Sequence, residues 1–146
     1  MIELLDLAPW VVQLQAQCPS FDGRVFKTLP DDELTIDLYD SPVAFVYLES
    51  DESDDNRNKN GSVRQITVNT VAVEIIIRRA STDRLHESAV DFIRSYRKEV
   101  FNALIAWQPP GCIKPVQHVA GKLQKKEAKQ LKWIDTFSTE NLITSL

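Results

Sequence analysis

The sequence predicts a single-domain α+β protein, and three features of its 146 residues indicate this class. The length is that of one typical domain. Apolar residues (43%) and charged residues (26%) occur in nearly average globular proportions, so the chain can build a core. Helix and strand patterns do not alternate regularly, which favours a mostly antiparallel or mixed sheet with two helices packed on one face. We expect residues 1–146 to form this one domain.

The N-terminal segment predicts an amphipathic helix over residues 2–17, because apolar residues recur at helical spacing. Asp6 is a candidate cap for a helix that begins near Leu7, and Pro9 suits a first turn. A short strand is expected at 24–28. The acidic segment that follows it, up to Pro42, has little pattern and is interpreted as a loop.

Two strands and a connecting loop are expected next. Residues 43–49 are almost continuously apolar, which is typical of a strand buried on both faces. Residues 50–61 are polar and acidic, and predict a long mobile hairpin loop. Residues 62–79 form the longest strand signal. Their apolar alternation changes parity between Val68 and Val71, which predicts a β-bulge between these two residues.

The C-terminal half predicts a helix followed by a hairpin. Residues 82–107 carry one apolar stripe at helical spacing, and the Gln108-Pro109-Pro110-Gly111 sequence ends the helix. Strands are expected at 116–125 and 130–138, joined by a lysine-rich turn. Residues 139–146 are expected to be an irregular tail.

Charge is unevenly distributed along the chain. The net charge is −4, from 17 basic and 21 acidic residues, which is opposite to the usual sign of nucleic-acid-binding modules. Residues 31–55 contain ten acids and no Lys or Arg, whereas residues 114–132 contain six lysines and one acid. Such blocks can simply keep loops solvated, or they can favour head-to-tail contact between copies that closes into a ring. The candidate subunit-contact residues are Asp51, Asp54, Asp55, Lys122, Lys125, Lys126 and Lys129.

Motifs for catalysis or cofactor binding are missing from the sequence. The histidines and cysteines, His86, His118, Cys18 and Cys112, have no zinc-type spacing, and neither cysteine is flanked by a base. The four glycines form no phosphate-binding loop. We therefore expect no catalytic residue, no cofactor and no metal. Acids at 31–33 and 51–55 leave a small metal-dependent nuclease as an alternative, disfavoured because unpatterned loops do not fix ligand geometry.

The sequence also bears on location. No run approaches the roughly 20 apolar residues of a membrane helix, and Glu3 and Asp6 interrupt the start of the chain. Two cysteines are too few for a disulfide scaffold. We expect synthesis in the cytoplasm and no membrane partner.

Four segments, in order and spacing, resemble the phage tail terminator family. They are the N-terminal Met1-Ile2-Glu3 helix, the strand that leads from Val63-Arg64-Gln65 into 71–78, the long helix ending in Trp107-Gln108-Pro109-Pro110-Gly111, and the closing 131–139 with its Trp133, Asp135 and Phe137. Together they span most of the chain.

The resemblance implies a structural virion protein of the tail or neck, assembled in the host cytoplasm, with no catalysis. It implies a hexameric ring that caps the tail tube, stops tube polymerisation and offers an attachment surface to the head or neck. The implied partners are further copies of the chain, the tube protein, a neck or head-completion protein, and the sheath in a contractile tail. Genome DNA would pass through the ring without sequence-specific binding. The alternative is another head–tail connector or head-closure protein.

Overall fold

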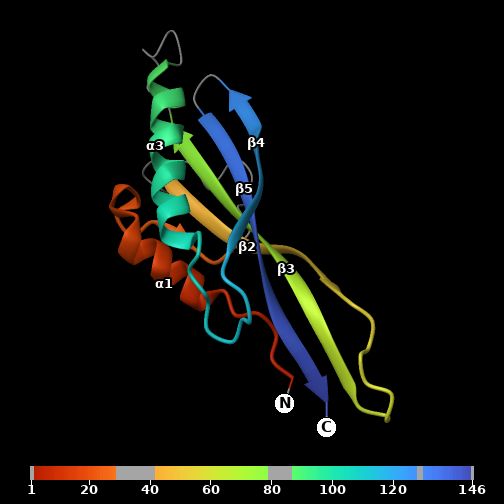
Figure 1. Cartoon of the computed structure of the whole chain (residues 1–146). Coiled ribbons are helices and arrows are strands. Elements are labelled where there is room, and N and C mark those ends of the chain that lie inside the picture. The colour runs from red at the N-terminus through yellow and green to blue at the C-terminus, as the bar shows by residue number, and fades with distance from the viewer. Residues whose placement is uncertain (1, 29–41, 79–86, 128–129, 146) are drawn as a thin grey trace.

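A computed structural model describes residues 2–28, 42–78, 87–127 and 130–145. Within them, two α-helices pack against one five-stranded sheet (Figure 1). In chain order the elements are α1 (Ala8–Gln17), the short 3₁₀ turn η1 (Pro19–Phe21), β1 (Val25–Phe26), β2 (Val43–Ser53), β3 (Val63–Arg78), α3 (Glu87–Leu104), β4 (Gln117–Glu127) and β5 (Gln130–Ser145).

The sheet is mixed, with strand order β1-β2-β3-β5-β4. Only β1 runs parallel to its neighbour, pairing Val25 with Ala44, and the other three pairings are antiparallel. Strands β3 and β5 form the longest pairing in the sheet, because their register is unbroken over the whole length of β3. The predicted α+β class is confirmed.

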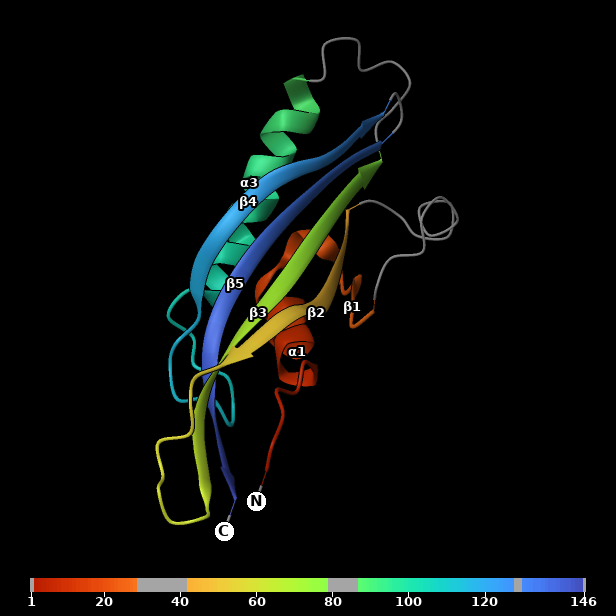
Figure 2. The same cartoon turned by 90° about the vertical axis from the view of Figure 1, so that its right-hand side faces the viewer.

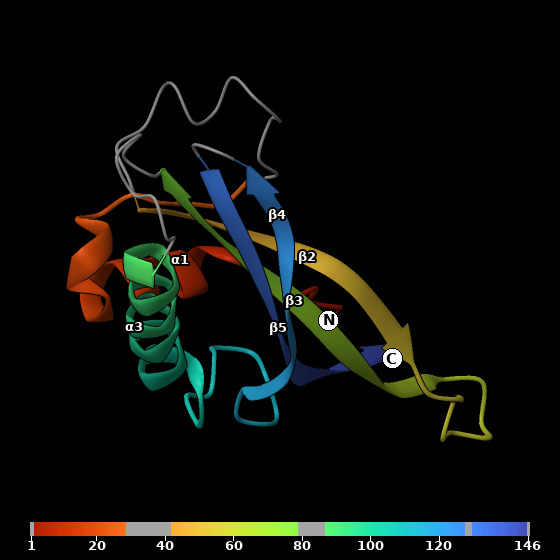
Figure 3. The same ribbon diagram turned by 90° about the horizontal axis from the view of Figure 1, so that it is seen from above.

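The main core lies between the sheet and both helices, which cover the same face (Figures 2 and 3). Odd-numbered residues of β3 from Val71 to Ile77 point into this core, as the two-residue period of a strand requires. The ring of Trp10 from α1 meets that of Trp107 edge-on, with centroids 5.6 Å apart. Other buried members are Leu14, Cys18, Phe21, Ala44, Val46, Ile93, Val100, Ala103, Leu104, Val116, Leu131 and Phe137.

A second, smaller cluster lies on the opposite face of the sheet. It contains Val43 and Phe45 of β2 and Ile76 of β3, with Phe26 of β1 packed against it. Residues 43–46 are therefore buried on both faces, whereas Tyr47 is half-buried and Leu48 and Glu49 are exposed, so the burial predicted for 43–49 is found only in its first four residues.

Both helices are shorter than predicted where the structure describes them. Helix α1 begins at Ala8 rather than at residue 2, and the carboxylate of Asp6 accepts the N–H of Ala8 at 3.0 Å. Helix α3 ends at Leu104, before Trp107, because Ala106 takes a left-handed backbone conformation with φ 68°. The predicted start of this helix, 82–86, lies outside the described residues.

The strands run further than the apolar pattern indicates. Strand β2 continues to Ser53, which pairs with Thr67, so the hairpin loop predicted from residue 50 begins only after residue 53. The irregular tail predicted for 139–146 is wrong, since β5 extends to Ser145. Main-chain hydrogen bonds stabilise these polar extensions without an apolar face.

The predicted bulge is at the right level of the sheet but in the wrong strand. The register shifts in β2, between Leu48 and Ser50, whereas β3 pairs with β5 without interruption. Ile66 and Val68 are simply on the opposite face of β3 from Val71. Beyond the bulge, β3 and β5 extend past the helices as a narrow ribbon, formed by residues 63–70 and 138–145. Both chain termini lie towards the end of this ribbon (Figure 1).

Candidate functional site

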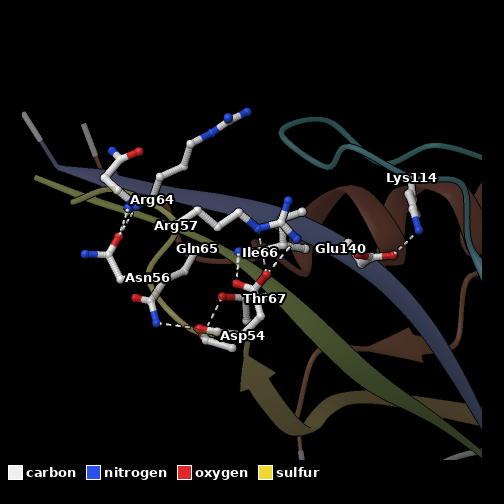
Figure 4. A network of polar contacts seen from close by, with 11 residues as sticks. Asp54, Asn56, Arg57, Arg64, Gln65, Ile66, Thr67, Lys114 and Glu140 are labelled. Atoms are coloured by element: carbon white, nitrogen blue, oxygen red, sulfur yellow. Dashed lines mark hydrogen bonds and ion pairs between the residues drawn. The ribbon is translucent and has the colours of Figure 1, made fainter.

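Asp54 organises the hairpin at the end of the ribbon (Figure 4). Its main-chain N–H donates to the carbonyl of Ile66 at 2.9 Å, and its Oδ1 accepts the N–H of Ile66 at 2.7 Å. The Nε and Nη2 of Arg57 donate to its Oδ2 at 2.9 and 2.7 Å. The hydrogen bond from Ile66, followed by that from Arg57, lowers the pKa of Asp54. Asp54 therefore holds both limbs of the hairpin together.

Asn56 adds a second set of bonds across the same hairpin. Its Oδ1 accepts the N–H of Arg64 at 2.9 Å, and its Nδ2 donates to the carbonyl of Ser62 at 3.0 Å. The side chains of Asp51 and Asp55 remain exposed beside this bonded frame. Of the three acidic candidates, one is engaged within the subunit and two face solvent.

The described basic candidates belong to β4, which β3 and β5 separate from β2. Lys122 is exposed on β4 and lines a groove of about 390 Å³ on the sheet face away from the helices, together with Tyr47, Glu49 and Ile134. Lys125 and Lys126 are also in β4, and Lys129 lies outside the described residues.

One subunit does not bring the acidic and basic candidates together. Asp54 bonds to Ile66 of β3, whereas Lys125 is aligned through Lys132 with Ile76. These β3 positions are ten residues apart (76 − 66), which at about 3.3 Å per residue separates the two levels by roughly 33 Å. Asp51 pairs with Asn69, and Lys122 is aligned through Ile134 with Glu74, so their levels are five residues apart (74 − 69), or roughly 17 Å, and their strands β2 and β4 are separated by β3 and β5.

A buried ionic cluster, which the sequence reasoning missed, joins α3 to β4 and β5. The carboxylate of Asp135 is 1% exposed and accepts two hydrogen bonds from Arg97, both at 2.9 Å. The Nε2 of His118 lies 2.9 Å from its other side. The guanidinium of Arg97 also stacks on the ring of Trp133, 4.3 Å from its centroid.

Gly121 makes room for this cluster. A Cβ at that position would collide with the carboxylate of Asp135 and stand 2.8 Å from a nitrogen of Arg97. One signal could have revealed the cluster, because Arg97 interrupts the apolar stripe of α3 between Ile93 and Val100. Asp135 pairs with both Arg97 and His118 and links three elements, while the Nε1 of Trp133 is buried without a hydrogen-bond partner among the described residues.

The cysteines behave as core residues. Burial, with a smaller contribution from Glu99, raises the pKa of the Cys18 thiol to about 12. Burial also raises the pKa of Cys112. Both thiols are free and protonated at neutral pH, so neither is a ready nucleophile.

Within the described part of the chain, His, Cys, Asp and Glu nowhere gather in a group of three or more that could hold a metal ion. The acids at 31–33 lie outside that part. No helix among the described residues is long and apolar enough to cross a membrane.

The family model described as phage tail terminator protein matches residues 1–145. The chain belongs to this family and is a structural protein of the virion tail.

A solved structure supports the fold. A chain of the "Virion of native gene transfer agent (GTA) particle" superposes with a TM-score of 0.59 at 16% identity, covering 94% of this chain and 93% of that chain. A comparison with proteins of curated function found no match.

Proposed function

We propose that this protein forms a ring on the end of the tail tube, where it stops tube polymerisation and presents the attachment surface for the head or neck. The observation that carries the proposal is that the exposed Asp51 of β2 and the exposed Lys122 of β4 lie towards opposite edges of one sheet. Head-to-tail association needs two different, complementary surfaces, and it closes into a ring when the rotation between copies allows. Six copies are the number that the family resemblance implies.

In the contact that we propose, Asp51 and Asp55 of one copy face Lys122, Lys125, Lys126 or Lys129 of the next. Asp54 contributes by holding the hairpin in shape. Exposed ion pairs each supply only about 0.2–1 kcal/mol, so these charges select the correct end of the neighbour rather than provide most of the affinity.

Charge reversal tests the contact. Changing Asp51 and Asp55 to Lys, or Lys122 and Lys125 to Glu, should weaken ring formation seen by negative-stain microscopy with tail tubes. Combining both reversals should restore it. Rings that form equally well in each separate reversal would rule the contact out.

Tail length tests the capping function. Tails assembled without this protein should be overlong, because tube growth is not stopped. Loss of a head-closure protein would instead give tails of normal length and heads that leak. Adding the purified protein to growing tubes should end their elongation, and tubes that keep growing would contradict the proposal.

The remaining partners follow from the position at the tube end. The tube protein would contact one side of the ring and a neck or head-completion protein the other, with the sheath as a further neighbour in a contractile tail. Genome DNA would pass through the ring without base-specific contacts.

A further inference from the structure

The sheet ends in two long edges that have no partner strand among the described residues. Strand β4 is the last in the strand order, with its outer side unpaired over Gln117–Glu127. On the other side, β1 pairs with β2 at Ala44 and Phe45, which leaves the outer edge of β2 from Leu48 to Ser53 without a partner strand among the described residues. Exposed edges of this length are templates for another strand.

The main chain of β2 directs hydrogen-bonding groups outward at defined residues. The N–H of Ala44 donates to the carbonyl of Arg24, on the outer side of the strand, at 3.0 Å. Alternate residues of a strand direct their main-chain groups to the same edge. Leu48, which lies beyond the residues paired with β1, therefore directs its N–H and C=O outward.

The same argument applies to β4. The carbonyl of Glu140 accepts the N–H of Ile113 at 2.8 Å, so even-numbered residues of β5 direct their groups towards the β4 side. Lys122, opposite Ile134, is therefore bonded inward. Leu123, the next residue along, directs its N–H and C=O outward.

The side chains on both edges suit a covered surface. Leu48 of β2 is 41% exposed, and Val119 and Leu123 of β4 are 56% and 47% exposed. Open edges are usually protected by charge or proline, and large apolar side chains there indicate a contact. The charges are also complementary, since the exposed residues of the β2 edge include Glu49, Asp51 and Glu52 and those of the β4 edge include Lys122.

We infer that the outer edge of β4 in one copy pairs antiparallel with the outer edge of β2 in the next copy, with Leu123 opposite Leu48. This inference rests on the proposed ring and, of the charged candidates, brings Lys122 close to Asp51. Within one subunit β2 runs parallel to β5 and β4 runs antiparallel to it. The strands β2 and β4 of one subunit are therefore antiparallel. Rotating a copy about an axis parallel to the strands keeps the strand directions, so β4 of one copy meets β2 of the next in antiparallel order.

The register follows from three conditions. Leu48 is level with Val71 and Leu123 with Trp133, so both side chains are on the helix-covered face. Both residues direct their main-chain groups outward and can form a bonded pair. Glu49 is the extra residue of the β2 bulge, so in this register Lys122 lies opposite Ser50, between Glu49 and Asp51 of the neighbour. The sheets of successive copies then join into one continuous sheet around the ring.

Paired cysteines test the register. Leu48→Cys and Leu123→Cys are introduced into one chain, and purified tails are oxidised mildly. Bonded antiparallel residues have Cα atoms about 5.5 Å apart, inside the disulfide range of roughly 4.4–6.8 Å. The native Cys18 and Cys112 are only 0% and 8% exposed. We expect a ladder of disulfide-linked multimers on a non-reducing gel.

Matched variants decide what the ladder means. Each single cysteine variant should stay monomeric on the gel. The same result is expected when Leu123→Cys is combined with Val90→Cys, which is on the exposed surface of α3. A ladder from the Val90 pair would overturn the proposed register, and so would only monomers from the Leu48 pair.

A lysine on the edge gives a second test. Leu123→Lys puts a charge where the neighbouring strand should lie, and should weaken ring association about tenfold or more. Val90→Lys, at a residue 58% exposed, should leave association unchanged. Circular dichroism checks that both variants fold, and equal ring formation by folded Leu123→Lys would contradict edge pairing.

The gel and the tail length separate the two proposals. Tails of controlled length without the ladder would overturn the edge pairing and leave capping in place. A ladder in tails whose length does not depend on this protein would retain the edge pairing and overturn capping.

Discussion

The same two strands, β3 and β5, build two unlike regions of this molecule. Under the helices, alternate residues of the two strands belong to the apolar core, namely Val71, Val73, Ile75, Ile77, Leu131 and Phe137. In the ribbon, buried positions are polar. Asn69 donates to Asn141 at 2.6 Å, and Thr139 donates to the carbonyl of Lys114 at 2.7 Å. The comparison shows that an unbroken strand pair can continue beyond its hydrophobic core when polar side chains find partners.

Each region also contains an arginine–carboxylate pair, and these pairs differ in burial. The side chain of Asp135 is 1% exposed beside Arg97, whereas that of Asp54 is 36% exposed beside Arg57. Removing one partner of a buried pair leaves an uncompensated charge, while water and salt screen an exposed one. The covered region should therefore be much more sensitive to substitution than the ribbon.

The largest effect is expected for Asp135→Ala. The change leaves Arg97 and His118 without their shared acceptor, and should lower the free energy of unfolding by about 3 kcal/mol. Denaturant titration followed by circular dichroism measures it. Asp55→Ala, on the exposed hairpin, is the control and should have little effect. A loss below about 1 kcal/mol would mean that the cluster does not brace the fold.

Gly121→Ala should be the next most damaging change. The added methyl group meets the carboxylate of Asp135, which is itself fixed by Arg97, so we expect a loss of about 1–3 kcal/mol. Gln124→Ala, at an exposed residue of the same strand, should change stability by less than about 0.5 kcal/mol. Equal thermal unfolding of both variants would contradict the predicted collision.

The reactivity of the two native cysteines allows the two regions to be compared without any substitution. Cys18 is in the helix-covered core, and Cys112 forms an isolated bridge with Asn141 of the ribbon. The ribbon should open locally at lower free energy than the core, so Cys112 should be alkylated first at neutral pH. Mass spectrometry over time measures the order. Modification of Cys18 before Cys112 would reverse our ranking of the two regions.

The smallest effect is expected for Asp54→Asn. Because the folded state lowers the pKa of Asp54, its stabilising contribution is present above the ordinary range of an aspartate, about pH 3.9, and is lost as pH falls through the lowered pKa. The variant should exchange the Ile66 amide hydrogen faster while global unfolding changes little. Asp55→Asn should leave that exchange rate unaltered. Unchanged Ile66 exchange in Asp54→Asn would show that the carboxylate does not hold the hairpin.

Local sequence determined the elements of the core. The continuous apolar run 43–46, the alternation that ends β3 and the apolar stripe of α3 each reflect burial, and burial is encoded residue by residue. The order of these elements was enough to predict the α+β class, both helices on one face, and the resemblance to the family.

Tertiary structure alone decided where pairing stops and which charges meet. Strands β2 and β5 extend through polar residues because β3 supplies hydrogen-bond partners, and no local pattern records this. The contacts of Asp135 with Arg97 and His118 bridge 38 and 17 residues of sequence. Main-chain pairing between strands and ionic contacts depend on residues that are distant in sequence. Periodicity indicates only which face of a helix or strand is buried, so it could not reveal these contacts.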